Sequence, residues 1–435
     1  MHSLRFSFMF LVALAVSRMT SGQIVLREAR EAPVPIAIQS FIKMPDNPDL
    51  SAVASDVEAA LTADLIFSRL FRVIPADSFL DPKITGPLEV INSESWRTLG
   101  AQYVARGRIS FDGPNVALEG FVFNITTAKL ALQKRYSVRR NEAENLAHMF
   151  GDDIVELVTG MKGLFSTKIA FSYTPPGKRW KEIWVMDFNG KNLKPLVQNN
   201  RTNLSPEWTV DGKNIFYTSS SIDDWHLWKT DMRGKQNQVT RFKGSALGPA
   251  MLPNGKELLV ALSKDGNPDI YLMKLDGTVV KRLTSRRGIN IAPYPSPDGK
   301  RFCFASDRFG NLHVFSMEID TGVTERLTRV GTLNDSCAWN PRDDLILFSG
   351  MDTDREFDIF AMNSSGQNME RLTYDAKSNE SPSWSPDGKL VAFSSRREGR
   401  NQIFVMKADG TAVLPLIELP GDASQPSWSP RLGYR

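Results

Sequence analysis

The chain has 435 residues, of which 41% are hydrophobic and 23% charged, the balance of a soluble globular protein. Its 53 basic and 49 acidic residues leave a net charge of only +4, and no dense run of Lys or Arg occurs, so the sequence gives no case for a nucleic-acid-binding protein. The length exceeds that of one ordinary domain, so we expect either two domains or a large repeat fold.

The first residues have the order of a secretory signal peptide. A basic residue precedes an apolar stretch from Phe6 to Val16, and small residues follow at Ser21 and Gly22. The apolar stretch is about half the ~20 residues that a membrane-spanning helix needs. We therefore predict a signal peptide at residues 1–22 and an exported, soluble mature protein that begins at Gln23.

The next region, residues 35–164, shows no internal repeat and predicts a small α/β domain. Apolar residues recur at helical spacing between Leu50 and Leu70, and Asn92 can cap a short helix that runs to Leu99. Three strand-like runs follow, and residues 141–161 have the pattern of an amphipathic helix. This domain joins the following region with almost no linker.

The remaining residues, 165–435, consist of six similar units. A glycine follows an apolar strand once in every 43–45 residues, at Gly190, Gly234, Gly277, Gly322, Gly366 and Gly410. A Pro-x-Trp motif or a variant of it opens each unit, and Asp-Gly or Asn-Gly marks a tight hairpin soon after it. Each unit therefore predicts four short strands, the pattern of a β-propeller blade.

The two ends of this region complete one another. The first unit begins with Lys168–Tyr173, which aligns with the second strand of the other units, and it has no opening strand before it. The last residues, Gln425–Pro430, repeat the opening motif with no unit after it. We therefore predict an α+β protein with a small N-terminal α/β domain and a six-bladed β-propeller that is closed by a C-terminal strand.

The cysteines and histidines give no sign of a metal or cofactor site. The only cysteines, Cys303 and Cys337, fall in strands of neighbouring units. Export permits a disulfide between them, but we expect two free, buried thiols. None of the four histidines lies near another with metal-ligand spacing. We expect no metal and no cofactor.

No catalytic motif is evident in the sequence. The Gly-x-Ser-x-Gly motif of α/β-hydrolases is absent, and the N-terminal region is too short for that domain. The Ser-Pro-Asp-Gly-Lys segments resemble the Asp-box of sialidases but lack its second Gly and its Trp at that spacing. We expect a protein without catalytic activity. The alternative is a secreted propeller hydrolase that acts on carbohydrate or peptide.

Asparagine recurs in the loop that precedes the opening motif. Four of the six units have it, at Asn203, Asn290, Asn334 and Asn379. One interpretation is structural, because Asn suits a turn with positive φ or a local backbone hydrogen bond. The other is functional, because these loops open together around the channel of a propeller and would form a polar ring there. Both interpretations stay open at this stage.

The order and size of these regions, with six blades and no hydrolase domain, resemble the TolB family, periplasmic components of the Tol–Pal system of Gram-negative bacteria. The resemblance implies a non-enzymatic, periplasmic protein, which we expect to be monomeric, that supports outer-membrane integrity and constriction at cell division. It implies that the lipoprotein Pal binds at the propeller mouth, through Asn203, Leu204, Ser245, Asn290, Ile291, Asn334, Asp335, Asn379, Glu380 and Ser424. It further implies that a segment at residues 23–34 binds the C-terminal domain of TolA, through Gln23, Ile24, Val25, Leu26 and Arg27.

Overall fold

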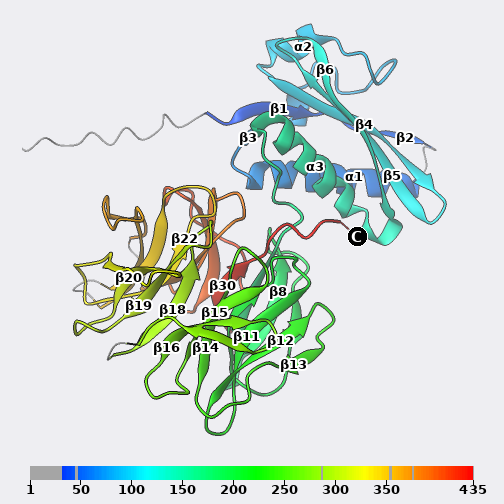
Figure 1. Ribbon diagram of the computed structural model, residues 1–435. Coiled ribbons are helices and arrows are strands. Elements are labelled where there is room, and N and C mark those ends of the chain that lie inside the picture. The colour runs from blue at the N-terminus through cyan, green and yellow to red at the C-terminus, as the bar shows by residue number, and fades with distance from the viewer. Residues whose placement is uncertain (1–31, 45–47, 286–287, 352–354, 375–376, 435) are drawn as a thin grey trace, which may run out of the picture.

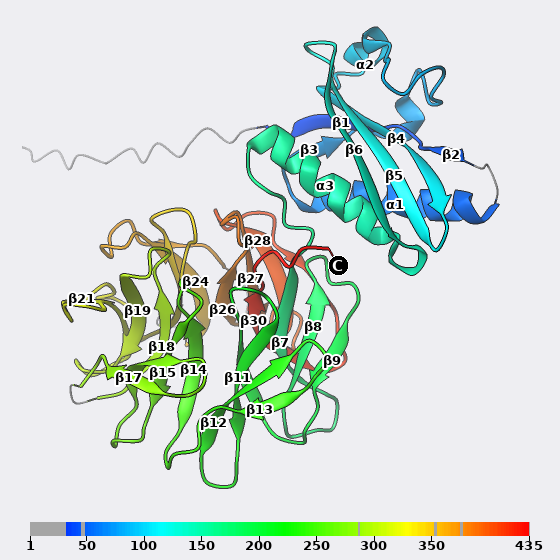
Figure 2. The same ribbon diagram turned by 45° about the vertical axis from the view of Figure 1, so that its right-hand side comes forward.

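The computed structural model describes residues 32–44, 48–285, 288–351, 355–374 and 377–434. An α/β domain stands next to a six-bladed β-propeller, and both are visible in Figure 1 and, from a second angle, in Figure 2. The predicted signal peptide, and Gln23 to Arg27 of the predicted TolA-binding segment, lie outside the described residues. Within the described part of the chain, no helix combines the length and the apolar character that crossing a bilayer requires.

The α/β domain is built on one mixed sheet with the strand order β3-β1-β4-β5-β6, in which β2 also pairs with β4. Strand β1 runs parallel to both of its neighbours, whereas β4, β5 and β6 form an antiparallel meander. The strands are β1 (Val34–Ile38), β2 (Ile42–Met44), β3 (Phe71–Val73), β4 (Tyr103–Asp112), β5 (Asn115–Asn124) and β6 (Lys129–Arg139).

Both faces of this sheet are covered. The long helices α1 (Pro48–Phe67) and α3 (Glu144–Thr159) pack on the face nearer the propeller (Figure 2). The short helix α2 (Ser93–Thr98) and its flanking loops cover the other face, where Trp96 and Phe121 are buried. Asn92 caps α2 by accepting a hydrogen bond from the backbone N–H of Glu94, as its sequence position predicts.

The propeller consists of six four-stranded antiparallel sheets. Blade one has the order β30-β7-β8-β9, with β30 (Asp422–Trp428), β7 (Lys168–Thr174), β8 (Glu182–Asp187) and β9 (Lys194–Val197). Blade two is β10 (Asn203–Trp208), β11 (Asn214–Ser220), β12 (Trp225–Asp231) and β13 (Gln236–Gln238), and blade three is β14 (Ala246–Met251), β15 (Glu257–Leu262), β16 (Asp269–Lys274) and β17 (Val279–Arg282).

The other three blades follow the same plan. Blade four is β18 (Asn290–Pro295), β19 (Arg301–Ser306), β20 (His313–Glu318) and β21 (Thr324–Arg326). Blade five is β22 (Leu333–Trp339), β23 (Ile346–Met351), β24 (Phe357–Met362) and β25 (Glu370–Arg371). Blade six is β26 (Asn379–Trp384), β27 (Leu390–Ser395), β28 (Gln402–Lys407) and β29 (Leu414–Pro415).

The C-terminal strand closes the ring, as the repeat pattern predicts. Strand β30 pairs antiparallel with β7, which places Trp428 opposite Ile169. The Trp428 indole N–H donates to Thr167 Oγ1 at 2.8 Å, and the Lys168 backbone N–H donates to Ser429 Oγ at 2.8 Å. Residues that are 261 positions apart in the chain therefore complete a single blade.

The repeated motifs have clear structural roles. The Trp384 indole N–H donates to Ala338 O in the inner strand of the preceding blade, so the Pro-x-Trp motif ties one blade to the next. Gly366, in one of the six repeated turns, has a φ of 75°, and a Cβ atom there would lie 2.5 Å from Leu327 O of the preceding blade. This turn therefore needs glycine both for its backbone conformation and for the close approach of its neighbour.

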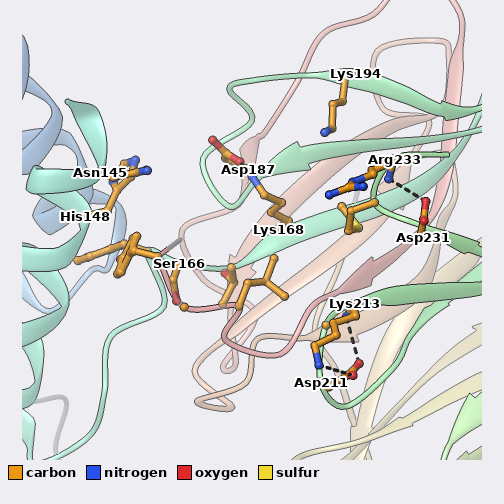
Figure 3. Close-up of a pocket in the computed structure, with 17 residues that line it drawn as sticks. Asn145, His148, Ser166, Lys168, Asp187, Lys194, Asp211, Lys213, Asp231 and Arg233 are labelled. Atoms are coloured by element: carbon orange, nitrogen blue, oxygen red, sulfur yellow. Dashed lines mark hydrogen bonds and ion pairs between the residues drawn. The ribbon is translucent and has the colours of Figure 1, made fainter. Parts of the chain in front are cut away.

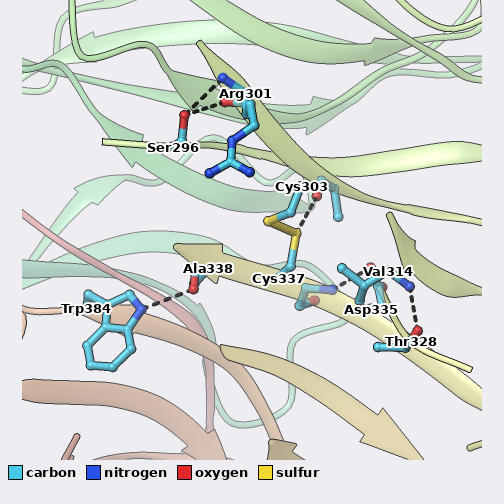
Figure 4. Close-up of a disulfide and its surroundings, with 11 residues drawn as sticks. Ser296, Arg301, Cys303, Val314, Thr328, Asp335, Cys337, Ala338 and Trp384 are labelled. Carbon is cyan, nitrogen blue, oxygen red and sulfur yellow. Dashed lines mark hydrogen bonds between the residues drawn. A yellow bond between two sulfur atoms is a disulfide. The ribbon is translucent and has the colours of Figure 1, made fainter. Parts of the chain in front are cut away.

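The cysteines correct one expectation. Cys303 and Cys337 form a disulfide between β19 of blade four and β22 of blade five (Figure 4). The Cα atoms are 6.3 Å apart, within the range that a disulfide can bridge, and both residues are buried. The expectation of free thiols was wrong because the sequence places the two residues in neighbouring blades but does not show that their side chains face each other.

Candidate functional site: the two ends of the propeller

The inner strands of all six blades begin at the same end of the propeller, which we call the mouth face. The loops between the second and third strands of each blade also lie there. Asn203 at the start of β10 pairs with Ser219 near the end of β11, and the equivalent residues pair in the same way in the other blades. The hairpins between inner and second strands lie at the opposite end, which faces the α/β domain and which we call the domain face (Figure 2).

The four repeated asparagines begin inner strands on the mouth face, but their side chains are buried between blades. Asn203, Asn290 and Asn379 have no exposed area, and Asn334 is 3% exposed. Asn203 Nδ2 donates to the backbone oxygens of Lys181 and Arg201. These asparagines therefore do not form an exposed polar ring, and their side chains make hydrogen bonds between neighbouring blades.

Two blade boundaries share a complete version of this clamp. Between blades three and four, Asn290 Nδ2 donates to Asp269 Oδ1 at 2.8 Å, and Thr284 Oγ1 donates to the same oxygen at 2.6 Å. Arg282 forms an ion pair with the other carboxylate oxygen, and Arg308 donates to Asn290 Oδ1 at 2.8 Å. Between blades five and six the corresponding residues make the same contacts: Asp358, Arg371, Thr373, Asn379 and Arg397.

The boundary between blades four and five replaces the carboxylate with a histidine. His313 Nδ1 lies 3.1 Å from Asn334 Nδ2 and 3.2 Å from Thr328 Oγ1. Because both neighbours offer a proton, Nδ1 acts as an acceptor and the ring is neutral. Burial, aided by the Arg326 guanidinium, lowers the pKa of His313 and favours this neutral form.

Positive φ occurs two residues after each asparagine or its equivalent. The residues are Ser205, Gly248, Ala292, Ser336, Ser381 and Gln425, and each lies at a bulge in an inner strand. Positive φ therefore falls near the repeated asparagines but not on them. Between each asparagine position and its bulge lies one residue, and five of these are predicted partner contacts: Leu204, Ile291, Asp335 and Glu380, which are half-buried, and Ser424, which is buried.

These five residues have mixed chemistry. Burial raises the pKa of both Asp335 and Glu380, and the Asp335 carboxylate raises the pKa of Glu380 further. The Lys181 ammonium donates to Ser424 Oγ at 2.9 Å, and burial lowers its pKa. The sixth predicted contact, Ser245, makes hydrogen bonds within the propeller. Its backbone N–H donates to Ser263 Oγ, and its hydroxyl accepts from the backbone N–H of Trp225.

One acidic group among the inner strands was not predicted. Glu207, on β10, accepts a hydrogen bond from the Met251 backbone N–H at 3.0 Å and one from Ser427 Oγ at 3.4 Å. Burial raises its pKa to about 7. The motif Pro-Glu-Trp, in which Glu stands where the other units have Ser, Ala or Tyr, is the only sequence signal for it.

The mouth face also carries exposed apolar side chains that the sequence analysis missed. The most exposed is Ile222, at 99%, in the loop between β11 and β12. Four more lie in mouth-face loops of blades two to six: Ile289, Phe309, Val330 and Tyr374. Exposed apolar residues that gather on one face are typical of a protein-binding surface.

Comparison with known proteins decides the family. A family model described as the TolB beta propeller domain matches residues 155–432, and another, described as the TolB amino-terminal domain, matches residues 22–130. The chain belongs to the TolB family. A TolB homolog from Chlorobium luteolum is 32% identical over 87% of this chain and 86% of its own length.

Two further relatives extend the comparison. The Tol-Pal system protein TolB of Desulfosudis oleivorans is 36% identical, over 59% of this chain and 58% of that protein. The crystal structure of TolB from Acinetobacter baumannii superposes with a TM-score of 0.78 at 26% identity, and the match covers 92% of this chain and 97% of that one. The TolB resemblance and the closed six-bladed architecture that the sequence predicts are thereby confirmed.

This TolB-family protein has a second candidate surface, a cavity of about 450 Å³ where the α/β domain meets the domain face (Figure 3). His148 on α3 lines the cavity together with Lys168, Lys194 and Arg233 of the propeller. His148 Nδ1 lies 2.6 Å from Asp64 Oδ2, and both residues are buried. Burial lowers the pKa of His148, but the hydrogen bond to Asp64 and the negative charges of Asp64, Glu144 and Asp187 together outweigh burial and raise the pKa.

The end of the described chain joins the two domains beside this cavity. The Tyr434 hydroxyl donates to Asp152 Oδ2 at 2.6 Å, and Arg431 Nε donates to Gly163 O at 2.6 Å. Burial raises the pKa of Asp152 to about 6. The strand that closes the TolB ring thus continues into contacts that fix the α/β domain. No group of three or more His, Cys, Asp or Glu side chains is arranged to hold a metal within the described ranges.

Proposed function

We propose that this TolB-family protein is a non-enzymatic periplasmic scaffold of the Tol–Pal system that binds the lipoprotein Pal at its mouth face. The observation that carries the proposal is the set of five exposed apolar side chains in mouth-face loops, at the same end of the propeller as the half-buried acidic residues Asp335 and Glu380. Apolar and acidic side chains at one end offer both buried area and orientation to a protein partner. Family membership favours this role over a secreted hydrolase.

A periplasmic location fits two independent features. The first residues have the pattern of a signal peptide, and the Cys303–Cys337 disulfide requires an oxidising compartment to form and persist. We further propose that residues 23–34 bind the C-terminal domain of TolA, with the apolar residues Ile24, Val25 and Leu26 adding to a partner sheet as an extended strand. Pal at the mouth would then shift the population of docked and free segments.

The experiment for the mouth face uses matched apolar-to-polar substitutions. Ile222→Ser with Phe309→Ser should weaken the binding of purified Pal at least tenfold in calorimetry, because each removes exposed apolar area from the proposed interface. Val323→Ser is the control, since Val323 is 55% exposed but lies next to β21, at the outer edge of blade four. Equal effects of the control and the mouth-face variants would count against the proposal.

The experiment for the N-terminal segment is a deletion. A mature protein that lacks residues 23–33 should lose TolA binding and keep Pal binding, because the mouth face lies at the far end of the propeller from the α/β domain (Figure 2). If binding of both partners were lost in a folded protein, the two sites would not be separate. A variant with Ile24, Val25 and Leu26 changed to Ser tests the apolar contacts without shortening the chain.

A further inference from the structure

Blades four and six each hold one of their own arginines in the same way. The Arg308 guanidinium stacks over Phe304 and Phe315, 5.2 and 4.7 Å from the ring centroids, and donates to Asn290 Oδ1 at 2.8 Å. In blade six, Arg397 stacks over Phe393 and Phe404 at 5.8 and 4.6 Å and donates to Asn379 Oδ1 at 3.1 Å. Each site combines two aromatic faces with one amide oxygen, a good match to a planar cation.

Blade five has the same aromatic pair and the same asparagine, but in the sequence another residue stands at the position of the arginine. Phe348 and Phe360 pair across β23 and β24 with their ring centroids 5.4 Å apart, compared with 5.8 Å for the pair in blade four and 6.1 Å for the pair in blade six. Asn334 occupies the position of Asn290 and Asn379. The residue that corresponds in sequence to Arg308 and Arg397 is Asp352, an acid in place of a base.

A cavity of about 110 Å³ lies at this place in blade five. It is lined by Val330, Gly331, Asn334, Phe348, Gly350, Met351, Phe360 and Met369. Gly350 stands where blades four and six have Ser306 and Ser395, and the Phe360 ring lies against it, because a Cβ atom at Gly350 would be 2.8 Å from that ring. The volume equals that of three to four water molecules at about 30 Å³ each, which is enough for the four heavy atoms of a guanidinium.

The amide oxygen in this cavity is available. Asn334 is 3% exposed, and its Nδ2 atom donates hydrogen bonds to His313 Nδ1 and to Val330 O. Among the described residues, no donor to Asn334 Oδ1 is recorded, whereas the equivalent oxygens of Asn290 and Asn379 each accept from an arginine. An amide oxygen that lines a cavity can accept a hydrogen bond from an N–H group that enters it.

We propose that this cavity is a socket for an arginine side chain that a partner protein supplies. The guanidinium would stack on Phe348 and Phe360 and donate to Asn334 Oδ1, in the arrangement that this chain builds twice with its own residues. The socket opens on the mouth face beside Val330, which is 64% exposed. A lysine would fit poorly, because an ammonium is a point charge that cannot stack along two ring faces. The inference does not depend on Pal being the partner.

The test is a titration of the full-length mature protein, labelled at its methionine methyl groups, with acetyl-arginine amide. The signals of Met351 and Met369, which line the socket, should shift and saturate with a dissociation constant on the order of millimolar. Acetyl-lysine amide should shift them at least tenfold less at equal concentration. Absent shifts, or equal shifts with the two amides, would overturn the proposal.

Three variants sharpen the result. Asp352→Arg places an arginine at the sequence position that Arg308 and Arg397 hold in blades four and six, and should abolish the response of Met351 and Met369. Phe360→Leu removes one aromatic face while keeping the socket apolar, and should weaken binding several-fold. Arg397→Ala is the positive control, because it opens the equivalent socket in blade six and its thermal stability should be partly restored by acetyl-arginine amide. Undiminished binding in both Asp352→Arg and Phe360→Leu would place the ligand elsewhere.

Discussion

Asn334 and His313 face each other across the boundary between blades four and five, with 3.1 Å between the amide nitrogen and Nδ1 of the ring. At the two neighbouring boundaries the same asparagine position donates to a carboxylate, Asp269 or Asp358. A carboxylate remains an acceptor down to low pH, whereas a histidine stops accepting at Nδ1 once it is protonated there. This boundary is therefore the one at which the clamp depends on protonation near neutral pH.

Replacing His313 with Gln should reduce the acid sensitivity of the fold. The pKa of His313 is lowered in the folded state, so its contribution to stability is present above the unfolded value of 6.5 and is lost as pH falls through the folded value. Gln402 occupies the same strand position in blade six, so the fold accepts this side chain. The measurement is the melting temperature at pH 7.5 and 5.0. An equal drop in the wild type and the variant would remove His313 as the cause.

Replacing Glu207 with Gln should act in the opposite pH direction. Burial raises the pKa of Glu207 from 4.5 to about 7, so the folded state favours the protonated acid. Its contribution to stability is present below pH 4.5 and is lost as pH rises toward 7. An amide cannot ionise, so the variant should be more stable than the wild type at pH 8, by about 1–3 kcal/mol in urea unfolding, and similar to it at pH 4. A less stable variant at pH 8 would contradict this account.

Removing the disulfide should destabilise the propeller without changing its architecture. The bond closes a loop of 34 residues between blades four and five, and a link of this size stabilises a fold by about 2–4 kcal/mol. We expect Cys303→Ala with Cys337→Ala to show that loss in urea unfolding. The reduced wild type should behave like the variant. The rate of backbone hydrogen exchange should rise most in β19 and β22. A uniform rise across all six blades would contradict the expectation that the disulfide stabilises the fold locally.

Replacing Trp428 with Phe tests the closure of the ring. The substitution keeps most of the apolar contact but removes the hydrogen bond from the indole to Thr167, which should cost about 1 kcal/mol. Trp339→Phe is the matched control, because Trp339 occupies the same inner-strand position in blade five and no acceptor for its indole N–H is recorded among the described residues. Thermal unfolding compares the two. A larger loss in the control would show that packing, and not this bond, dominates at ring closure.

Much of the fold follows from the sequence because the repeat constrains it. Gly366 and its five counterparts all have positive φ, and at four of the six turns a Cβ atom would also lie under 3.0 Å from a backbone oxygen, so the spacing of these glycines reveals the blades. Trp428, which opens a unit that has no continuation, reveals the closure of the ring. Both signals are local in the sequence, and the glycine turn recurs six times at a spacing of 43–45 residues, which a chance pattern would not produce.

The candidate site was harder to predict because it depends on where side chains point. Asn334 was predicted to lie in an exposed ring at the mouth, but its side chain is buried. A shift of one residue along a strand decides whether a side chain faces solvent or the adjacent blade, and the sequence does not show which. Ile222 stands in the loop between β11 and β12, whose sequence differs from those of the equivalent loops in the other blades, so no pattern singles it out. Cys303 and Cys337 pair through a contact between separate blades, which only the three-dimensional arrangement shows.

The pairing of β30 with β7 also sets the order in which the molecule can mature. Synthesis delivers β7 first, and its partner follows about 250 residues later, so β7 presents an open edge until nearly all of the propeller has emerged. A chain that is interrupted before Asp422 keeps that edge and offers it to other strands or to proteases. Ring closure therefore separates finished molecules from unfinished ones, and quality control can act on that difference without recognising any particular sequence.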